Sequence, residues 1–301
     1  MSYRKEQYPG FKESDAVSGI NYLNELAEKE INDLFREILD RGIYGFCFSL
    51  YEEGQKPGDI IPAEQIRKRM QILKPHTRSV RTFSCIEGNE LIPQIAKEFG
   101  LKTLVGAWLG SDKEKNEEEV KGLIRLAKEG YVDIAAVGNE VLYREDLNEN
   151  ELLRYIKRVK KEIPEIPVGY VDAYYEFVQR PAITDACDII LCNCYPFWEG
   201  TEFKHSLQHM RHMYSQVVDA ANGKDVLIAE TGWPSDGKSL GGAIPSPENA
   251  MKYFINTNLW ANSENIGVFY FSSFDESWKI GNEGDVGAFW GIWDKTGNLK
   301  Y

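Results

Sequence analysis

Two glutamates stand where apolar, strand-like runs end. In the segment Val226–Ser235, an apolar, β-branched run ends in Glu230, and a Gly-Trp-Pro turn follows. The segment Ile134–Glu140 has the same pattern and ends in Glu140. Each run predicts a buried strand that presents one charged group at its C-terminal end. Two carboxylates presented in this way are what a two-carboxylate glycoside hydrolase needs.

A fold must bring these two distant strand ends together. Strand-like runs recur near residues 43–49, 79–84, 103–109, 133–138, 167–171, 188–194, 225–230 and 266–273. Stretches with helical periodicity lie between them, such as Ala63–Leu73, Glu117–Lys128, Asn150–Lys161, Ser206–Ala221 and Pro247–Trp260. Eight strands alternating with helices predict an α/β protein, a (β/α)8 TIM barrel. Active sites of this fold lie at the C-terminal strand ends, so Glu140 and Glu230 point into one mouth.

The chain is predicted to form a single domain. It has 301 residues, and no low-complexity segment or Pro/Gly/Ser-rich linker divides it. We therefore expect one catalytic domain over residues 1–301. The length beyond a typical barrel of about 250 residues is mostly an N-terminal helical extension. This helical segment, about Asp15 to Asp40 within residues 1–42, is expected to pack on the barrel.

Composition and charge exclude several classes of function. The net charge of −12 argues against binding to nucleic acid or to anionic membranes. No run of about 18 apolar residues exists, so no membrane insertion is expected. The N-terminus lacks the apolar core of a signal peptide, which predicts a cytoplasmic protein or an exported one whose signal has been removed. We expect a monomer.

The five cysteines do not form a disulfide framework, because their number is odd and the chain is long. Most of them lie in apolar, strand-like runs, where cysteine behaves as a small hydrophobe. Buried free thiols are therefore expected at Cys47, Cys85, Cys187, Cys192 and Cys194.

Specific motifs resemble a known family. Val137–Glu140 and Ala229–Ser235 are similar to the two signatures of glycoside hydrolase family 17, the β-1,3-glucanases and related glucanosyltransferases. The resemblance runs nearly end to end and is closest to the compact bacterial and fungal branch. It also includes Gly45–Ser49 with Gly54 and Gln55, Val80–Ser84, Gly106–Gly110, Tyr195–Gly200, Phe274–Lys279 and Glu283–Gly291.

The resemblance implies a retaining mechanism on β-1,3-glucan. In it, Glu140 is the acid/base and Glu230 is the nucleophile that forms a covalent glycosyl-enzyme. Asn139, beside the acid, is expected to bind the sugar 2-hydroxyl. The family pattern also brings Glu276 and Lys279 to the site as a supporting pair. Many relatives have Asn or Pro where this chain has Ser277, which leaves the detailed role of the pair open.

Aromatic side chains are expected to bind the sugar rings, because they present flat apolar faces. Four candidates lie at or just past predicted strand ends, namely Trp108, Tyr195, Trp198 and Trp233. Ordinary packing is an alternative for Trp108 and Trp198. Arg81 could orient a carboxylate or a sugar hydroxyl, and a surface or barrel-layer ion pair is an equal alternative.

Two other patterns point to different chemistry. Gly232–Ser239 satisfies the phosphate-loop pattern, but Pro234 removes a backbone donor and a turn-forming stretch replaces the required helix. His205, His209 and His212 share one face of a predicted outer helix. We interpret them as a solvated polar face and predict no metal site and no cofactor.

Three functions follow from these observations. Hydrolysis of β-1,3-glucan is the first, and glucanosyl transfer at the same site is the second. A non-catalytic glycan-binding barrel is disfavoured, because mere binding needs neither an acid nor a nucleophile. Nothing in the sequence separates hydrolysis from transfer, or endo from exo action.

Overall fold

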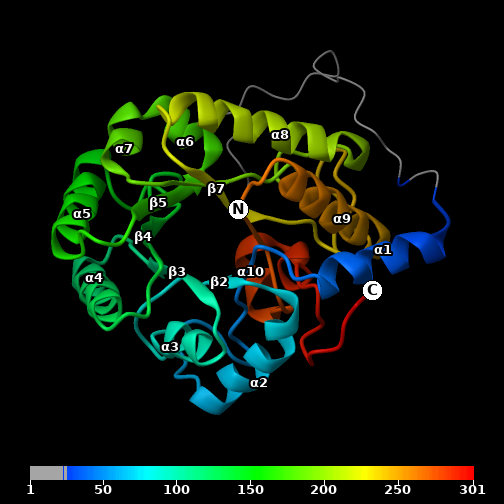
Figure 1. The fold of residues 1–301 in the computed structure, drawn as a ribbon, viewed down its shortest axis with the longest axis horizontal. Coiled ribbons are helices and arrows are strands. Elements are labelled where there is room, and N and C mark those ends of the chain that lie inside the picture. The colour runs from blue at the N-terminus through cyan, green and yellow to red at the C-terminus, as the bar shows by residue number, and fades with distance from the viewer. Residues whose placement is uncertain (1–22, 24–25) are drawn as a thin grey trace.

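The chain folds as a closed barrel of parallel strands inside a ring of helices, which confirms the predicted (β/α)8 architecture (Figure 1). The computed structural model describes residue 23 and residues 26–301. Neighbouring strands pair in chain order and β8 pairs with β1. The strands are β1 Gly45–Cys47, β2 Ser79–Arg81, β3 Lys102–Ala107, β4 Ile134–Asn139, β5 Val168–Ala173, β6 Ile190–Asn193, β7 Val226–Thr231 and β8 Val268–Tyr270.

Helices follow the strands around the outside. The longer ones are α1 Glu28–Asp40, α2 Ala63–Leu73, α3 Leu91–Glu98, α4 Lys113–Lys128, α5 Glu149–Glu162, α8 Phe203–Ala220 and α9 Pro247–Ser263. Shorter helices are η3 Lys74–His76, α6 Tyr174–Gln179, α7 Pro181–Ala186, η4 Ser277–Lys279, α10 Ile280–Glu283 and η5 Asp285–Ala288. Among the residues that the structure describes, no helix is both long and apolar enough to span a membrane.

Local signals in the sequence set where several helices begin. Asn148 accepts a hydrogen bond from the Glu151 amide, and Glu151 reaches back to the Asn148 amide, which is a capping box. Ser246 accepts from the Asn249 amide just before Pro247. These contacts satisfy amides that have no partner within the first turn of a helix.

The strands are buried along most of their length because both of their faces are covered. Every residue of β1, β2, β5, β6 and β8 is buried. Parallel strands inside a ring of helices have no solvated face, so they read as continuous apolar runs rather than as alternating ones. All strands run in one direction, and their C-terminal ends therefore meet at one rim of the barrel.

Helix α1 packs against α9 at the side of the barrel (Figure 1). Its buried residues are spaced as one apolar face: Ile31, Phe35, Ile38 and Leu39. The Phe35 ring centroid lies 5.1 Å from that of Phe254 on α9 and 5.3 Å from that of Tyr301. The rest of the helical segment expected from about Asp15 lies largely outside the described residues.

We expect Phe35→Ala to reduce the free energy of unfolding by about 3–5 kcal/mol, because it leaves a cavity between α1 and α9. Urea denaturation measures this change, and one cooperative transition is expected for a single domain. The control Asp33→Ala removes an exposed side chain of the same helix and should change stability by less than about 0.5 kcal/mol. Equal stability of the two variants would contradict a structural role for α1.

Candidate active site

The two predicted glutamates are brought together by the end of strand β6. Glu140 follows β4 directly, and Glu230 lies one residue before the end of β7. The Asn193 amide donates to Oε1 of Glu140 at 2.9 Å, and the Tyr195 hydroxyl donates to Oε2 of Glu230 at 2.9 Å. Residues two apart along an extended chain share a face, which explains how one chain end contacts both carboxylates.

Arg81 lies inside the barrel and orients a carboxylate. Its side chain is almost fully buried, and Nη1 is 2.5 Å from Oε1 of Glu230. Nη2 donates to Oδ1 of Asn139 at 2.6 Å, and Nη1 also donates to the carbonyl of Ala229 at 3.1 Å. The surface ion pair is therefore wrong, whereas the ion pair inside the barrel, the other form of that alternative, is present. A guanidinium that bridges two polar side chains fixes both of them in place.

The environment of Glu140 favours its protonated form. Burial and, to a smaller extent, the nearby charge of Glu230 raise the pKa of Glu140 to about 7. The Asn193 amide and the charges of Arg144 and Arg81 oppose this increase only in part. A carboxyl group with such a pKa is suited to donate a proton near neutral pH.

The backbone at Glu140 is held in an uncommon conformation. Its φ angle is 51°, in the left-handed region that favours glycine. The Glu140 amide donates to the Val171 carbonyl of the neighbouring strand β5 at 2.8 Å, and Arg144 bonds the carbonyls of Asn139 and Leu109. Surrounding contacts thus impose this backbone, as is frequent at functional sites.

Glu276 and Lys279 form a buried pair in the segment after β8. The Lys279 ammonium lies 2.8 Å from Oε2 of Glu276 and 4.2 Å from the centroid of the Phe271 ring. Burial alone would lower the pKa of Lys279, but the charges of Glu276, Glu283 and Glu230 raise it above its ordinary value. The pair therefore lies within electrostatic range of Glu230.

Ser277 lies between Glu276 and Lys279 in the sequence and departs from the family pattern. The Ser277 hydroxyl donates to Oε2 of Glu53 at 2.9 Å. Glu53 belongs to the loop between β1 and α2 and also pairs with Lys295 at 2.6 Å. Ser277 therefore connects two loops of the mouth.

The four aromatic candidates have different surroundings. Tyr195 is buried against Glu230, while Trp198 is half-buried with its ring centroid 5.5 Å from that of Trp290. Trp108 is 39% exposed, and the Arg144 guanidinium lies 4.5 Å from its ring centroid. Trp108 and Trp198 thus retain accessible surface that a sugar can contact.

Trp233 was expected to bind a sugar ring, but the structure buries it. It is 1% exposed, and its indole nitrogen donates to the Ile244 carbonyl at 2.9 Å. Its ring packs among Phe197, Phe203 and Tyr253. Trp233 is a packing residue because the loop after β7 folds back over it.

Sequence reasoning missed Asn193 and Glu283. Asn193 carries the hydrogen bond to Glu140, and its position opposite two buried cysteines on a strand was the available signal. The pKa of Glu283 is raised to about 7, mainly by burial; the charge of Lys279 opposes this increase, and the charges of Glu230 and Glu140 contribute to it. Glu283 lies within a quoted motif but follows no strand, so its place could not be inferred.

The histidine face was only partly predicted. His209 is buried, with Nε2 at 2.9 Å from Oε2 of Glu199 and Nδ1 at 2.6 Å from the Thr201 hydroxyl. The expectation of a solvated face is therefore wrong for His209, because α8 packs on the loop after β6. His212 is exposed. Within residues 26–301 and residue 23, no group of three His, Cys, Asp or Glu is suited to hold a metal ion.

The phosphate-loop pattern has the wrong structural context. No helix begins directly after Ser239, since the next helix, α9, begins at Pro247. A Cβ atom at Gly232 would lie 2.1 Å from the Phe271 carbonyl oxygen, so this glycine allows close packing of two loops.

The five cysteines are all buried, free thiols.

Comparison with known proteins shows the family to which the chain belongs. The BtgE/BtgC glycoside hydrolase domain family matches residues 45–291, and the chain belongs to this family. It is 30% identical over 258 residues to glucan 1,3-beta-glucosidase BGL2 of Candida albicans, covering 77% of this chain and 83% of that protein. A glucan 1,3-beta-glucosidase of Saccharomyces cerevisiae is 27% identical over 77% of this chain and 82% of its own length.

Solved structures of similar fold include a glucanosyltransferase and a glucanase. An active-site mutant of the Rhizomucor miehei beta-1,3-glucanosyltransferase, in complex with laminaritriose, is 30% identical with a TM-score of 0.78. The match covers 86% of this chain and 96% of that one. A beta-1,3-glucanase and allergen of Cryptomeria japonica pollen is 16% identical with a TM-score of 0.61 over 86% of this chain and 97% of its own, which shows a shared fold.

The raised pKa of Glu140 predicts a pH dependence of stability. The folded-state value of about 7 lies above the ordinary 4.5, so the folded protein binds more protons between these values. The free energy of unfolding should therefore decrease as pH rises from about 5 to about 8. Glu140→Gln removes this contribution, and its decrease should be smaller than that of the wild type by up to about 3 kcal/mol.

Urea denaturation at both pH values measures the difference. Glu165→Gln, at an exposed glutamate, is the matched control and should follow the wild type. If Glu140→Gln lost as much stability as the wild type over this range, Glu140 would not titrate as described.

Proposed function

We propose that this chain is a retaining glycoside hydrolase that cleaves β-1,3-glucan through a covalent glycosyl-enzyme. The observation that carries the proposal is the pair of carboxylates, which β6 connects at one barrel mouth but which have different partners. Glu230 is oriented by a cation and a hydroxyl, whereas Glu140 accepts from a neutral amide. The glucan 1,3-beta-glucosidases among the relatives support the choice of substrate.

The reaction takes two steps. In the first, a carboxylate oxygen of Glu230 attacks the anomeric carbon while Glu140 donates its proton to the departing glycosidic oxygen. One carbon–oxygen bond breaks and an ester bond to Glu230 forms. In the second step, Glu140 takes a proton from water, the water oxygen attacks the anomeric carbon, and Glu230 leaves as a carboxylate.

The neighbouring charge explains how Glu140 can act first as an acid and then as a base. The negative charge of Glu230 contributes to the raised pKa of Glu140. This charge disappears when Glu230 becomes an ester, so the pKa of Glu140 decreases in the intermediate. Glu140 is then ionised and can accept a proton from water, as the second step requires.

Glucanosyl transfer is the second candidate, favoured by the likeness to a beta-1,3-glucanosyltransferase at 30% identity. In this reaction a sugar hydroxyl, rather than water, attacks the same intermediate. Both reactions use Glu140 and Glu230 in the same roles. A non-catalytic glycan-binding barrel is less well supported, because it would not need an acid with a raised pKa.

Incubation of the purified protein with linear β-1,3-gluco-oligosaccharides tests the proposal. We expect products shorter than the substrate, followed over time by mass spectrometry. Products longer than the substrate would identify transfer as the main or a competing reaction. No change in any oligosaccharide would contradict both candidate functions.

Two substitutions separate the roles of the glutamates. Glu230→Gln should abolish turnover of every substrate, since no nucleophile remains. Glu140→Ala should slow cleavage of natural glucan by about 10²–10⁴-fold. It should spare the first step with aryl glucosides whose leaving groups need no proton, which a burst of released phenol measures. Equal losses of Glu140→Ala on both substrates would contradict its role as the acid.

A further inference from the structure

A charged side chain from an outer helix lies buried beside the barrel mouth. Arg69 of α2 is 3% exposed, and its guanidinium donates to the Ser49 carbonyl at 3.0 Å and to the Lys295 carbonyl at 3.4 Å. It also lies 4.6 Å from the centroid of the Phe274 ring. A buried guanidinium is costly unless its donors are satisfied, and here they join three separate segments.

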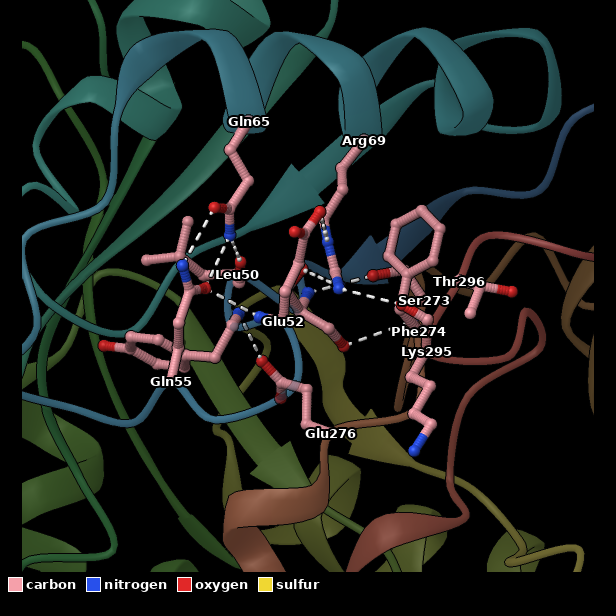
Figure 2. A network of polar contacts seen from close by, with 12 residues as sticks. Leu50, Glu52, Gln55, Gln65, Arg69, Ser273, Phe274, Glu276, Lys295 and Thr296 are labelled. Carbon is pink, nitrogen blue, oxygen red and sulfur yellow. Dashed lines mark hydrogen bonds and ion pairs between the residues drawn. The ribbon is translucent and has the colours of Figure 1, made fainter.

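Gln65, one helical turn before Arg69, contacts the same loop. Its amide donates to the Leu50 carbonyl at 3.0 Å and exchanges two hydrogen bonds with Gln55 at 2.7 and 3.0 Å. Figure 2 shows both side chains extending from α2 toward the loop that follows β1. Residues four apart share a helix face, so α2 holds this loop at two adjacent carbonyls.

The loop in turn holds Glu276. The Tyr51 amide donates to Oε1 of Glu276 at 2.9 Å, while Oε2 lies 2.8 Å from the Lys279 ammonium. The Ser49 hydroxyl also accepts from the Phe274 amide at 3.2 Å. A shift of the loop backbone would therefore move the Glu276 carboxylate, and Lys279 with it.

Electrostatics links the same groups. Burial lowers the pKa of Arg69, and the carboxylates of Glu276 and Glu52 oppose this decrease. Lys279 is in turn within electrostatic range of Glu230. The charge of Glu276 therefore acts on two buried cations, Arg69 and Lys279, and the charge of Glu230 acts on the second of them.

We infer that Arg69 is a positioning residue for the reaction: it fixes the loop after β1 so that the Glu276–Lys279 pair stays beside Glu230. This inference rests on the function proposed above. A residue that only stabilised the fold would affect folding, but its effect on turnover would not depend on Glu276.

The chain offers a matched control two residues away. Arg67 lies on the same helix and pairs with Glu98 at 2.8 Å, but both side chains are well exposed. Arg67→Met therefore removes an arginine and its ion pair from α2 without touching the loop. Exposed pairs of this kind contribute little to stability.

Kinetics of Arg69→Met, Arg69→Lys and Arg67→Met on a β-1,3-gluco-oligosaccharide test the inference. Both Arg69 variants should lower kcat by at least about tenfold with a smaller change in KM. Lysine should not substitute for arginine, because one ammonium does not reproduce the planar fork of donors. Arg67→Met should stay within about twofold of the wild type.

A double-mutant cycle separates positioning from stabilisation. Added to Glu276→Gln, Arg69→Lys should lower kcat by less than about twofold further, because Arg69 is inferred to act on turnover through the Glu276 carboxylate. Independent, multiplicative effects would overturn the inference. Arg69→Lys keeps the charge, so it serves if Arg69→Met does not fold.

Hydrogen–deuterium exchange gives a readout that needs no activity. Exchange of the Tyr51 amide should be faster in both Arg69 variants than in the wild type and unchanged in Arg67→Met. Unchanged exchange in the Arg69 variants would overturn the inference. If the wild type does not alter the oligosaccharides, the proposed function fails, while this exchange measurement still decides whether Arg69 holds the loop.

Discussion

The contact on which the rest of the mouth depends is the buried ion pair between Arg81 and Glu230. Arg81 ends β2, yet its guanidinium reaches Glu230 on β7 and Asn139 on β4, strands that do not neighbour β2 in the barrel. Only a closed barrel brings these strand ends across from one another. Removing either charge would leave its partner buried and unpaired, which is strongly destabilising. Closure of the sheet and orientation of the candidate nucleophile are therefore aspects of one arrangement.

The same principle explains why two glutamates with identical sequence patterns differ in their chemistry. Each buried carboxylate of the mouth has a partner, but the partners differ in charge. Glu230 faces the guanidinium of Arg81 and Glu276 faces the ammonium of Lys279, whereas Glu140 accepts from the neutral amide of Asn193. Burial with only a neutral direct partner raises the pKa of Glu140 to about 7. The environments, rather than the residue types, separate the acid from the nucleophile.

The sequence predicted the barrel and the meeting of Glu140 and Glu230, because parallel strands covered on both faces give continuous apolar runs with distinct ends. It could not predict contacts that depend on how loops fold back. Trp233 follows a strand end as Trp108 and Tyr195 do, but its loop covers it and it packs in the core. His209 lies on an outer helix yet is buried against the loop after β6. Helical periodicity gives the face of a residue, and it does not give what lies over that face.

Hydrolysis and glucanosyl transfer share the first step, so Glu140 and Glu230 cannot decide between them. They differ in whether water or a sugar hydroxyl reaches the covalent intermediate, which depends on the loops at the strand ends. Side chains of outer helices hold these loops: Arg69 of α2 holds the loop after β1, and the Glu119 carboxylate of α4 accepts from the Cys85 amide after β2 at 2.7 Å. Motifs at strand ends do not contain these helix residues. A distinction between hydrolase and transferase must therefore be sought in contacts between helices and loops, because these contacts set the shape around the two glutamates.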